Sequence, residues 1–353
     1  MTDRPRIGFA CSYTPLPVID AAGFLPHRLL PTGDAPAQSG ALLHDNLCPH
    51  VLRILDRALA GEFPPLAGVV VMNSCDAMRR LADAWRTTRP ADRLIVLDLP
   101  MAPSAQLTAD FREELTRLVD FLVAAGGVRP SDDALAESVA TYQELASGLD
   151  LLRDRARRGV LPGGWAKLQE INNQSVTQPV GATLAAIGAI LAEAEAPDGA
   201  ARGAPIYLIG NVLPEPEALA LFAECGARLA GEDLCTGARQ HALLDFDGPG
   251  DALDCFARAW LARTPCARTF DAAAPGAVAR LIAEKAKACG ARGVVAHVMK
   301  FCDPYLARLP YIQDELQRQN LPLLTLMGDC GGGALGQFRT RLEAFVEMLG
   351  ARS

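Results

Sequence analysis

Short runs of apolar residues alternate along the chain with longer segments of helical spacing. The run Val69-Val70-Val71-Met72 predicts a buried strand, because three of its four residues are β-branched. Asn73 and Ser74 end this run, and residues 77–85 then predict a helix. Cys75 therefore lies at the carboxyl end of a strand and at the start of a helix. Other strands are predicted over residues 6–11, 24–30, 93–100 and 205–210, and within 227–237, 293–304 and 322–330.

Helices separate most of these strands, which predicts parallel sheets with helices on both faces. The predicted helices cover residues 15–22, 108–125, 132–158, 183–195, 215–225, 252–264, 277–289 and 337–349, and one opens within 42–50 and runs to about 60. We expect an α/β protein with one lobe at 1–130, a helical connecting segment at 131–203 and a second lobe at 204–353. Asp132 is the expected cap of the first connecting helix. Residues 197–203 form the clearest boundary loop.

Composition excludes several classes of function. The chain has 353 residues, enough for two cores, and its formal net charge is -7. This acidic balance, without a basic tail, argues against a nucleic-acid partner. The first residues contain no signal-peptide core, and no apolar run approaches the roughly 18 residues of a membrane span. We therefore predict a cytoplasmic protein with no membrane partner.

Ten cysteines are the strongest sign of chemistry in the chain. Disulfides are rare in reducing compartments, so metal binding or redox chemistry is the leading interpretation. Several cysteines lie at predicted strand ends or helix starts, where a helix dipole favours a thiolate. Parallel strands end on one edge of a sheet, so cysteines distant in sequence can meet in a cleft between two lobes. This pattern applies to Cys11, Cys48, Cys75, Cys235, Cys302 and Cys330.

The chemistry of these side chains favours an iron–sulfur cluster. Several soft thiolates in one cleft suit either iron–sulfur or zinc, and the absence of paired histidine ligands favours iron–sulfur. Cys225, Cys255 and Cys289 lie at apolar positions of predicted helices, and we interpret them as structural.

Other polar residues are weaker candidates. Asp76 and Asp303 each follow a candidate ligand, where capping a helix is the more common role and proton delivery is the alternative. Lys300 is a second weak catalytic candidate, because its charge would raise the potential of a nearby cluster. His297 lies within an apolar strand and is expected to be a core residue. Gly331-Gly332-Gly333 lacks the spacing of a nucleotide-binding loop, so a plain turn is expected.

Seven motifs in a fixed order resemble those of the 2-hydroxyacyl-CoA dehydratase D-component family, which includes benzoyl-CoA reductase subunits and double-cubane cluster proteins. The resemblance runs from about residue 8 to 349. The motifs are Cys11-Ser12-Tyr13-Thr14-Pro15 with Ala21-Ala22-Gly23, Asn46-Leu47-Cys48-Pro49, Asn73-Ser74-Cys75-Asp76, Asp233-Leu234-Cys235-Thr236-Gly237, Thr264-Pro265-Cys266-Ala267-Arg268, Lys300-Phe301-Cys302-Asp303-Pro304, and the stretch 336–345 that begins Gly336-Gln337-Phe338-Arg339.

The resemblance implies two flavodoxin-like (Rossmann-like) lobes with an oxygen-sensitive cluster between them. In the dehydratases three cysteines hold a [4Fe-4S] cluster with one open iron, and these carry over to Cys48, Cys75 and Cys302. A separate ATP-hydrolysing activator with its own [4Fe-4S] cluster supplies low-potential electrons. This chain has no Walker motif, so that ATPase would be another protein.

Two cluster types remain open under this resemblance. Double-cubane members hold an [8Fe-9S] cluster and need about twice as many thiolates. We favour that type slightly, with Cys235, Cys266 and Cys330 as the second set of ligands and Cys11 in reserve. The absence of a further cysteine between Cys48 and Cys75 is the feature that departs from it.

Three functions follow, in order of preference. The first is a cluster-bearing reductase component, expected to be a homodimer, that reduces a small molecule. The second is a subunit of a 2-hydroxyacyl-CoA dehydratase or benzoyl-CoA reductase, paired with a paralogous subunit and acting on an acyl-CoA. The third is a non-catalytic electron-storage or scaffold protein with a closed cluster.

Overall fold

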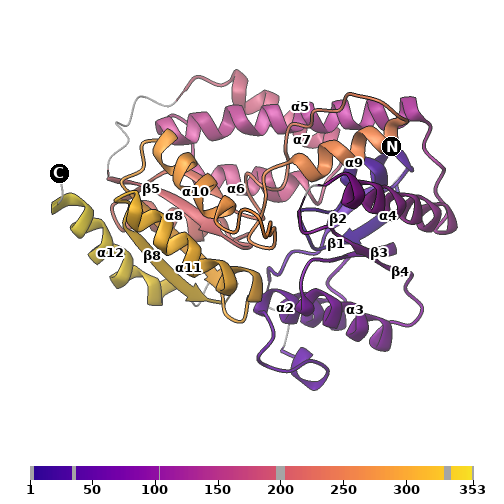
Figure 1. The fold of residues 1–353 in the computed structure, drawn as a ribbon, viewed down its shortest axis with the longest axis horizontal. Helices are drawn as coiled ribbons and strands as arrows, with labels where there is room; N and C mark the ends of the chain where they lie inside the picture. Colours follow the sequence, from indigo (N-terminus) through magenta and orange to yellow (C-terminus); the bar gives the residue numbers. More distant parts are fainter. Residues whose placement is uncertain (1–3, 34–36, 103, 196–202, 330–334, 352–353) are drawn as a thin grey trace.

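The computed structural model of the protein describes residues 4–33, 37–102, 104–195, 203–329 and 335–351. These residues contain two four-stranded sheets, each parallel throughout and each flanked by helices (Figure 1). The predicted α/β class with two flavodoxin-like lobes is confirmed. The strands are β1 (Arg6–Phe9), β2 (Leu25–Arg28), β3 (Leu66–Asn73), β4 (Leu94–Asp98), β5 (Ala204–Gly210), β6 (Ala227–Asp233), β7 (Gly293–Met299) and β8 (Leu323–Gly328).

The two sheets have the same strand order. It is β2-β1-β3-β4 in the first and β6-β5-β7-β8 in the second, so the first strand of each lobe lies between the second and the third. The chain direction along the sheet therefore reverses beside β1 and beside β5. In open α/β sheets ligands bind at such a switch point, at the carboxyl ends of the strands. The fold thus provides two crevices, one from each lobe.

The helices carry the rest of the fold. They are α1 (Leu16–Ala21), α2 (Pro49–Leu59), α3 (Asp76–Thr88), α4 (Ala105–Ala124), α5 (Asp132–Arg158), α6 (Gly164–Ser175), α7 (Val180–Ala192), α8 (Pro216–Glu224), α9 (Ala252–Ala262), α10 (Ala277–Ala288), α11 (Asp303–Arg318) and α12 (Leu335–Ala351), with a 3-10 turn at Ser39–Ala41. Among the described residues no helix is both long and apolar enough to cross a membrane.

The continuous apolar run in β3 reflects burial on both faces of the first sheet. Val69 and Val71 belong to the core that includes residues of α2 and α3. Val70 and Met72 belong to a second core with Phe111 of α4. Burying each such side chain contributes about 1.5–3 kcal/mol. A strand covered on both sides therefore has no polar alternation.

The connecting segment contains one long helix that reaches both lobes. Figure 1 shows α5 crossing above the two sheets. Ser131 caps this helix, because its Oγ accepts a hydrogen bond from the Ala134 backbone N–H at 3.2 Å. The expectation that Asp132 is the cap is therefore wrong, and Asp132 is the first helical residue. Gly159 ends the helix in the left-handed region, with φ of 77°.

Two helices, α6 and α11, are not among the predicted ones. Glycines at 159, 163 and 164 hide the start of α6, and Pro310 lies inside α11. Proline normally interrupts a helix, so the sequence pattern is misleading there. The predicted loop at 197–203 lies outside the described residues except for Gly203.

Helix α9 follows the second lobe's strand β6 in sequence but packs against the first lobe. Its Phe256 and Trp260 share a core with Phe111 of α4. The Arg112 guanidinium on α4 pairs with the Asp251 carboxylate at 2.8 Å. Figure 1 shows α9 and α4 side by side. The division into three chain segments stays a prediction, but the lobes are joined by more than the connecting helices.

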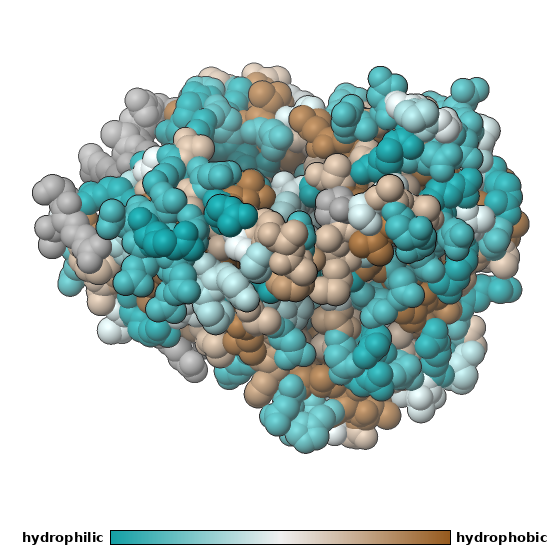
Figure 2. Space-filling view, viewed as in Figure 1, coloured by the Kyte–Doolittle hydropathy of each residue, from teal (hydrophilic) through white to brown (hydrophobic). Residues whose placement is uncertain are grey.

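Hydrophobic residues are mainly interior. On the face shown in Figure 2, hydrophilic residues cover most of the outer helices, and hydrophobic residues gather toward the junction of the lobes.

Candidate metal centre

A cavity lies where the carboxyl ends of the two sheets face each other. Its volume is about 110 Å³, which is below the range of about 300–1,000 Å³ for ligand pockets. Its walls are the segments that follow β1, β3, β5, β6 and β7, together with the start of α2. Six of the nine cysteines that the structure describes line it, namely Cys11, Cys48, Cys75, Cys235, Cys266 and Cys302.

The cavity therefore brings together five of the six predicted ligands and the reserve cysteine. Cys330 lies outside the described residues, as does the glycine run that follows it. Cys225, Cys255 and Cys289, which we interpret as structural, are not among the lining residues. Cys225 packs in the core of the second lobe, Cys255 is buried on α9, and Cys289 packs against the core that also contains Cys48 and Cys302.

The three cysteines assigned by the family resemblance share one local geometry. Cys48, Cys75 and Cys302 occupy the N-cap positions of α2, α3 and α11. The first backbone N–H groups of a helix have no partner inside the helix, and the helix dipole is positive at that end. Three helix N-termini therefore direct a positive field at thiols on the cavity wall. We call this set the N-cap cysteines.

Cysteine takes the cap position that was expected for aspartate. Asp76 and Asp303 occupy the first helical position after Cys75 and Cys302. The expectation that these carboxylates cap the helices is therefore wrong. Both are exposed, and each adds a negative charge at a positive helix end.

Burial opposes ionisation of two of the N-cap cysteines, Cys75 and Cys302, as long as no metal is bound. It raises the pKa of Cys302 to about 12, and hydrogen bonds from the Tyr305 backbone and the Asn211 side chain only partly offset this. Burial also raises the pKa of Cys75, against hydrogen bonds from the Met78 and Ala77 backbones. The thiols of Cys75 and Cys302 are thus protonated near neutral pH, and a metal that binds them must displace protons.

Asn211 fixes the Cys302 side chain. Its Nδ2 donates to Cys302 Sγ at 2.9 Å, and its Oδ1 accepts from the Met299 backbone N–H at 3.0 Å. Both bonds cross the switch point of the second sheet, because Asn211 follows β5 and Cys302 follows β7. Hydrogen bonds to ligand sulfur orient the ligand and adjust the potential of a bound cluster.

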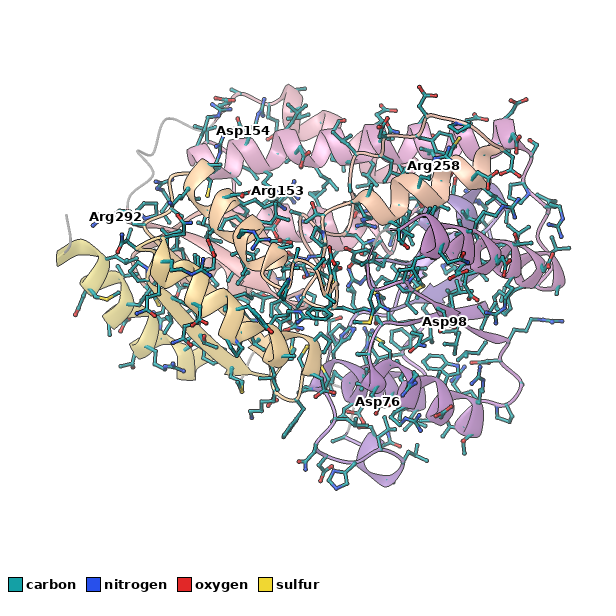
Figure 3. All side chains as sticks on the ribbon, in the orientation of Figure 1. Asp76, Asp98, Arg153, Asp154, Arg258 and Arg292 are labelled. Atoms are coloured by element: carbon teal, nitrogen blue, oxygen red, sulfur yellow. The ribbon has the colours of Figure 1, made fainter. Side chains whose placement is uncertain are left out.

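The remaining three cysteines lie in loops, and we call them the loop cysteines: Cys11, Cys235 and Cys266. The Cys235 loop is folded around Glu232, whose buried carboxylate accepts from the Leu234 and Ala238 backbone N–H groups at 2.9 and 2.7 Å. A Cβ at position 237 would lie 2.3 Å from Glu232 Oε2, so that position requires glycine. Arg153 on α5 also contacts this carboxylate at 3.2 Å, and Figure 3 shows it directed from α5 toward the second lobe.

Arginines surround the loop cysteines. Arg239 Nη1 donates to Cys235 Sγ at 3.2 Å, and the same guanidinium pairs with Asp233 at 2.8 Å. Arg268 holds the Cys266 loop to the first lobe by donating to the Leu99 and Pro100 carbonyl groups. Burial raises the pKa of Cys11 to about 11, although the charge of Arg28 lowers it. The positive electrostatic field at these thiols therefore comes from arginine side chains.

The donor set consists of soft thiols, which both iron–sulfur clusters and zinc accept as ligands. Within the described residues, no three His, Cys, Asp or Glu side chains are arranged to hold one ion. In a cubane each thiolate binds a different iron, so its ligands stand apart around an inorganic core. His50 Nδ1, on the cavity wall, is buried and has no hydrogen-bond partner in the part of the chain that the structure describes. A ligand-filled cavity would be expected to satisfy such an atom.

The weaker candidates lie outside the cavity. The Lys300 side chain is 49% exposed and pairs with Asp329 at 3.5 Å. Asp303 lines an outer groove of about 400 Å³ that is also lined by Cys75. His297 is buried in β7 and packs edge-on against Phe338, as expected for a core residue.

Several lining residues were missed by the sequence reasoning. Asn211 is a polar residue that directly follows a predicted strand. The same signal identified the cysteines, so it could have identified Asn211 as well. Arg28 ends a short apolar strand, and His50 lies two residues after Cys48. No local pattern separates Arg239 or Tyr305 from ordinary surface residues, although both are buried at this site.

Fold and site together define a class: a two-lobed α/β protein with a thiol-lined cavity between the lobes. The sequence profile described as "2-hydroxyglutaryl-CoA dehydratase, D-component" matches residues 11–349, and the chain belongs to this family. The resemblance found in the seven motifs is thereby confirmed.

Curated relatives agree over nearly the full length. Lactoyl-CoA dehydratase subunit beta of Anaerotignum propionicum is 25% identical over 362 residues, covering 99% of this chain and 92% of that protein. (R)-2-hydroxyglutaryl-CoA dehydratase subunit beta of Acidaminococcus fermentans is 22% identical, covering 98% and 93%. One of the subunits of benzoyl-CoA reductase from Thauera aromatica is 21% identical, covering 98% and 91%. The protein is a dehydratase-like enzyme of this family.

Proposed function

We propose that the protein is an iron–sulfur reductase component of the double-cubane type. It receives low-potential electrons from a separate ATP-hydrolysing activator that carries a [4Fe-4S] cluster, and it reduces a small substrate at its own cluster. The observation that carries this proposal is the presence of six cysteines from both lobes on the wall of one cavity. Six thiolates are twice the number that a cubane with one open iron requires.

The two sets of thiols have separate assignments in this proposal. The N-cap cysteines Cys48, Cys75 and Cys302 would hold one cubane. The loop cysteines Cys235 and Cys266 would hold the second, together with Cys11, which is described at the cavity, or Cys330, which stays the sequence prediction. A bound cluster would supply one-electron chemistry at iron.

The chain's own residues bind and shield this site. The helix N-termini stabilise negative charge on the N-cap sulfurs, and Asn211 orients Cys302. The aliphatic side chains of Val51, Met78 and Val212 help to keep the cavity wall apolar. A dry site strengthens each of these electrostatic interactions.

The outer groove offers a route for substrate. It shares Ser74, Cys75, Ala267, Arg268 and Pro304 with the inner cavity. Cys75 thus lies where the groove and the cavity meet, which supports an accessible iron at that ligand and disfavours a closed electron-storage cluster. Asp303 lines the groove and is the residue proposed to deliver a proton to substrate there.

A second candidate is favoured by the relatives. They are named as subunits of acyl-CoA dehydratases and of benzoyl-CoA reductase. In that case the protein would pair with a paralogous subunit, hold a single [4Fe-4S] cluster at the N-cap cysteines and act on an acyl-CoA.

Metal analysis separates these candidates. The protein is purified without oxygen, reconstituted with iron and sulfide, and assayed for both per chain. About eight irons support the double-cubane proposal, and about four support the single-cluster candidate. Only trace iron would defeat both. Mass measurement of the purified particle then tests homodimer against a requirement for a second subunit.

A further inference from the structure

Arg28 is a buried cation at the wall of the cavity. It ends β2, its residue is 1% exposed, and it lines the cavity beside the cysteines. Its Nη1 donates to the Cys235 carbonyl oxygen and to Gln240 Oε1, both at 2.6 Å. These bonds cross from the first lobe to the second. Arg28 therefore ties the Cys235 loop to the first sheet.

The rest of the guanidinium has no hydrogen-bond partner among the described residues. Its Nε and Nη2 are both buried and both unsatisfied there. Within the described part of the chain no carboxylate lies within ion-pair distance of Arg28, whereas the neighbouring Arg239 has Asp233 at 2.8 Å. Unused donors and an unpaired charge are both costly in a protein interior. The environment of Arg28 is incomplete without an anion.

The groups around Arg28 indicate where that anion belongs. Its electrostatic partners are the thiols of Cys235 and Cys11, on the same cavity wall. Because no described carboxylate lies within ion-pair distance, thiolates and the group that they bind are the anions that this wall can offer to Arg28.

Two further arginines near the loop cysteines also have no carboxylate partner among the described residues. Arg263 is buried and donates to the Ser12 carbonyl oxygen at 3.2 Å, and Arg268 donates to the Pro100 carbonyl oxygen at 2.6 Å. Within the described residues their hydrogen bonds go to backbone carbonyls, which carry no full charge. Positive charge therefore exceeds negative charge around the loop cysteines before any ligand binds.

We propose that Arg28 is a positioning residue that provides the counter-charge for an iron–sulfur cluster in this cavity and raises its midpoint potential. The inference rests on the proposed function. A bound cluster would become more negative by one unit on accepting one electron from a low-potential donor, and no bond would break. A fixed positive charge stabilises that reduced state more than the oxidised one.

Charge-changing variants test this role. Arg28→Lys keeps the charge, Arg28→Gln keeps donors without charge, and Arg28→Met keeps only the aliphatic stem. Arg57→Met is the matched control, because Arg57 is half-buried, pairs with Glu62 at 2.8 Å and is not a lining residue. Each protein is reconstituted with iron and sulfide without oxygen. Its midpoint potential is then measured by visible absorption during titration with titanium(III) citrate, and its iron release to a chelator is timed.

The expected result is a more negative midpoint potential and a several-fold faster loss of iron in Arg28→Gln and Arg28→Met. Arg28→Lys should lie closer to the wild type, and Arg57→Met should match it. Equal potentials in Arg28→Gln, Arg28→Lys and the wild type would overturn the inference while leaving the proposed function intact. If Arg28→Met does not fold or take up iron, the comparison of midpoint potentials between Arg28→Gln and Arg28→Lys still tests the inference. Trace iron in the wild type would instead defeat the proposed function itself, before any variant is compared.

Discussion

The positive electrostatic field at the N-cap cysteines has a different source from the field at the loop cysteines. Cys48, Cys75 and Cys302 face the starts of α2, α3 and α11, so their field comes from the backbone. Cys235 instead has the Arg239 guanidinium at 3.2 Å, and Arg28 acts on both Cys11 and Cys235. A backbone field persists wherever the helix forms. A side-chain field depends on a few distant residues, so single substitutions can remove it.

If both sets of cysteines bind iron as proposed, this difference gives them separate controls. The electrostatic potential at the N-cap cysteines would be set by the helix starts of the two-lobed fold. The hydrogen bond from Asn211 to Cys302 would change it further. The potential at the loop cysteines depends on arginines brought from both lobes. The following predictions test this division, from the largest expected effect to the smallest.

Removing an N-cap ligand should have the largest effect. Cys75→Ala is expected to abolish nearly all iron binding at the N-cap site, because the proposed cubane there would keep only two of its three thiolate ligands. Iron and sulfide per chain after anaerobic reconstitution provide the measurement. Cys289→Ala is the control, since that thiol is not a lining residue and should leave the iron content unchanged. Equal iron in both variants would contradict the assignment.

Removing a loop cysteine should have an equally large effect if two cubanes are present and no effect if only the N-cap cubane is present. Cys266→Ala is expected to reduce the iron content from about eight to about four per chain if two cubanes are present. The N-cap cubane would remain, because its ligands are untouched. An unchanged content of about four irons in both proteins would mean that the loop cysteines bind no iron. The same analysis therefore distinguishes the double-cubane proposal from the single-cluster candidate.

Loosening the Cys235 loop should lower stability. Glu232→Gln removes the charge that binds two backbone N–H groups and Arg153, and we expect a loss of about 1–3 kcal/mol in the free energy of unfolding. Thermal denaturation of the metal-free protein is the measurement. Glu224→Gln, at an exposed ion pair with Arg339, should change stability by less than about 0.5 kcal/mol. Similar losses in both variants would argue against a special role for Glu232.

The smallest effect is expected at the start of α3. Asp76→Asn removes a negative charge from the first helical position, which should cost about 0.3–1 kcal/mol through the helix dipole. Chemical denaturation at low salt measures this, and the difference should shrink at high salt. Asp83→Asn, in the middle of the same helix, is the control. An equal loss at both positions would show that the helix end has no special charge preference.

The sequence alone determined most of the local structure. The run Val69–Met72 predicted β3 because a strand buried on both faces needs continuous apolar residues. Cys75 was placed at a strand end and helix start for the same local reason, and the structure puts it there. Local signals failed where glycine or proline suggested a break, as at α6 and α11, and where Ser131 rather than Asp132 caps α5.

The sequence also identified the cysteines that follow strands, because parallel strands share one carboxyl edge. It could not decide which thiols face a common cavity. Cys11 is a lining residue although it was held in reserve, and Cys330 remains a prediction outside the described residues. That choice depends on how the two lobes are oriented, which no local pattern encodes.

Only the tertiary structure placed Arg28 against Cys235, more than two hundred residues away in sequence. The same holds for α9, which follows a strand of the second lobe and packs on the first. Short-range propensities determine helices, strands and caps, because these depend on neighbouring residues. Charge balance inside the cavity depends on side chains that meet only after both lobes have packed, so it was decided by the fold as a whole.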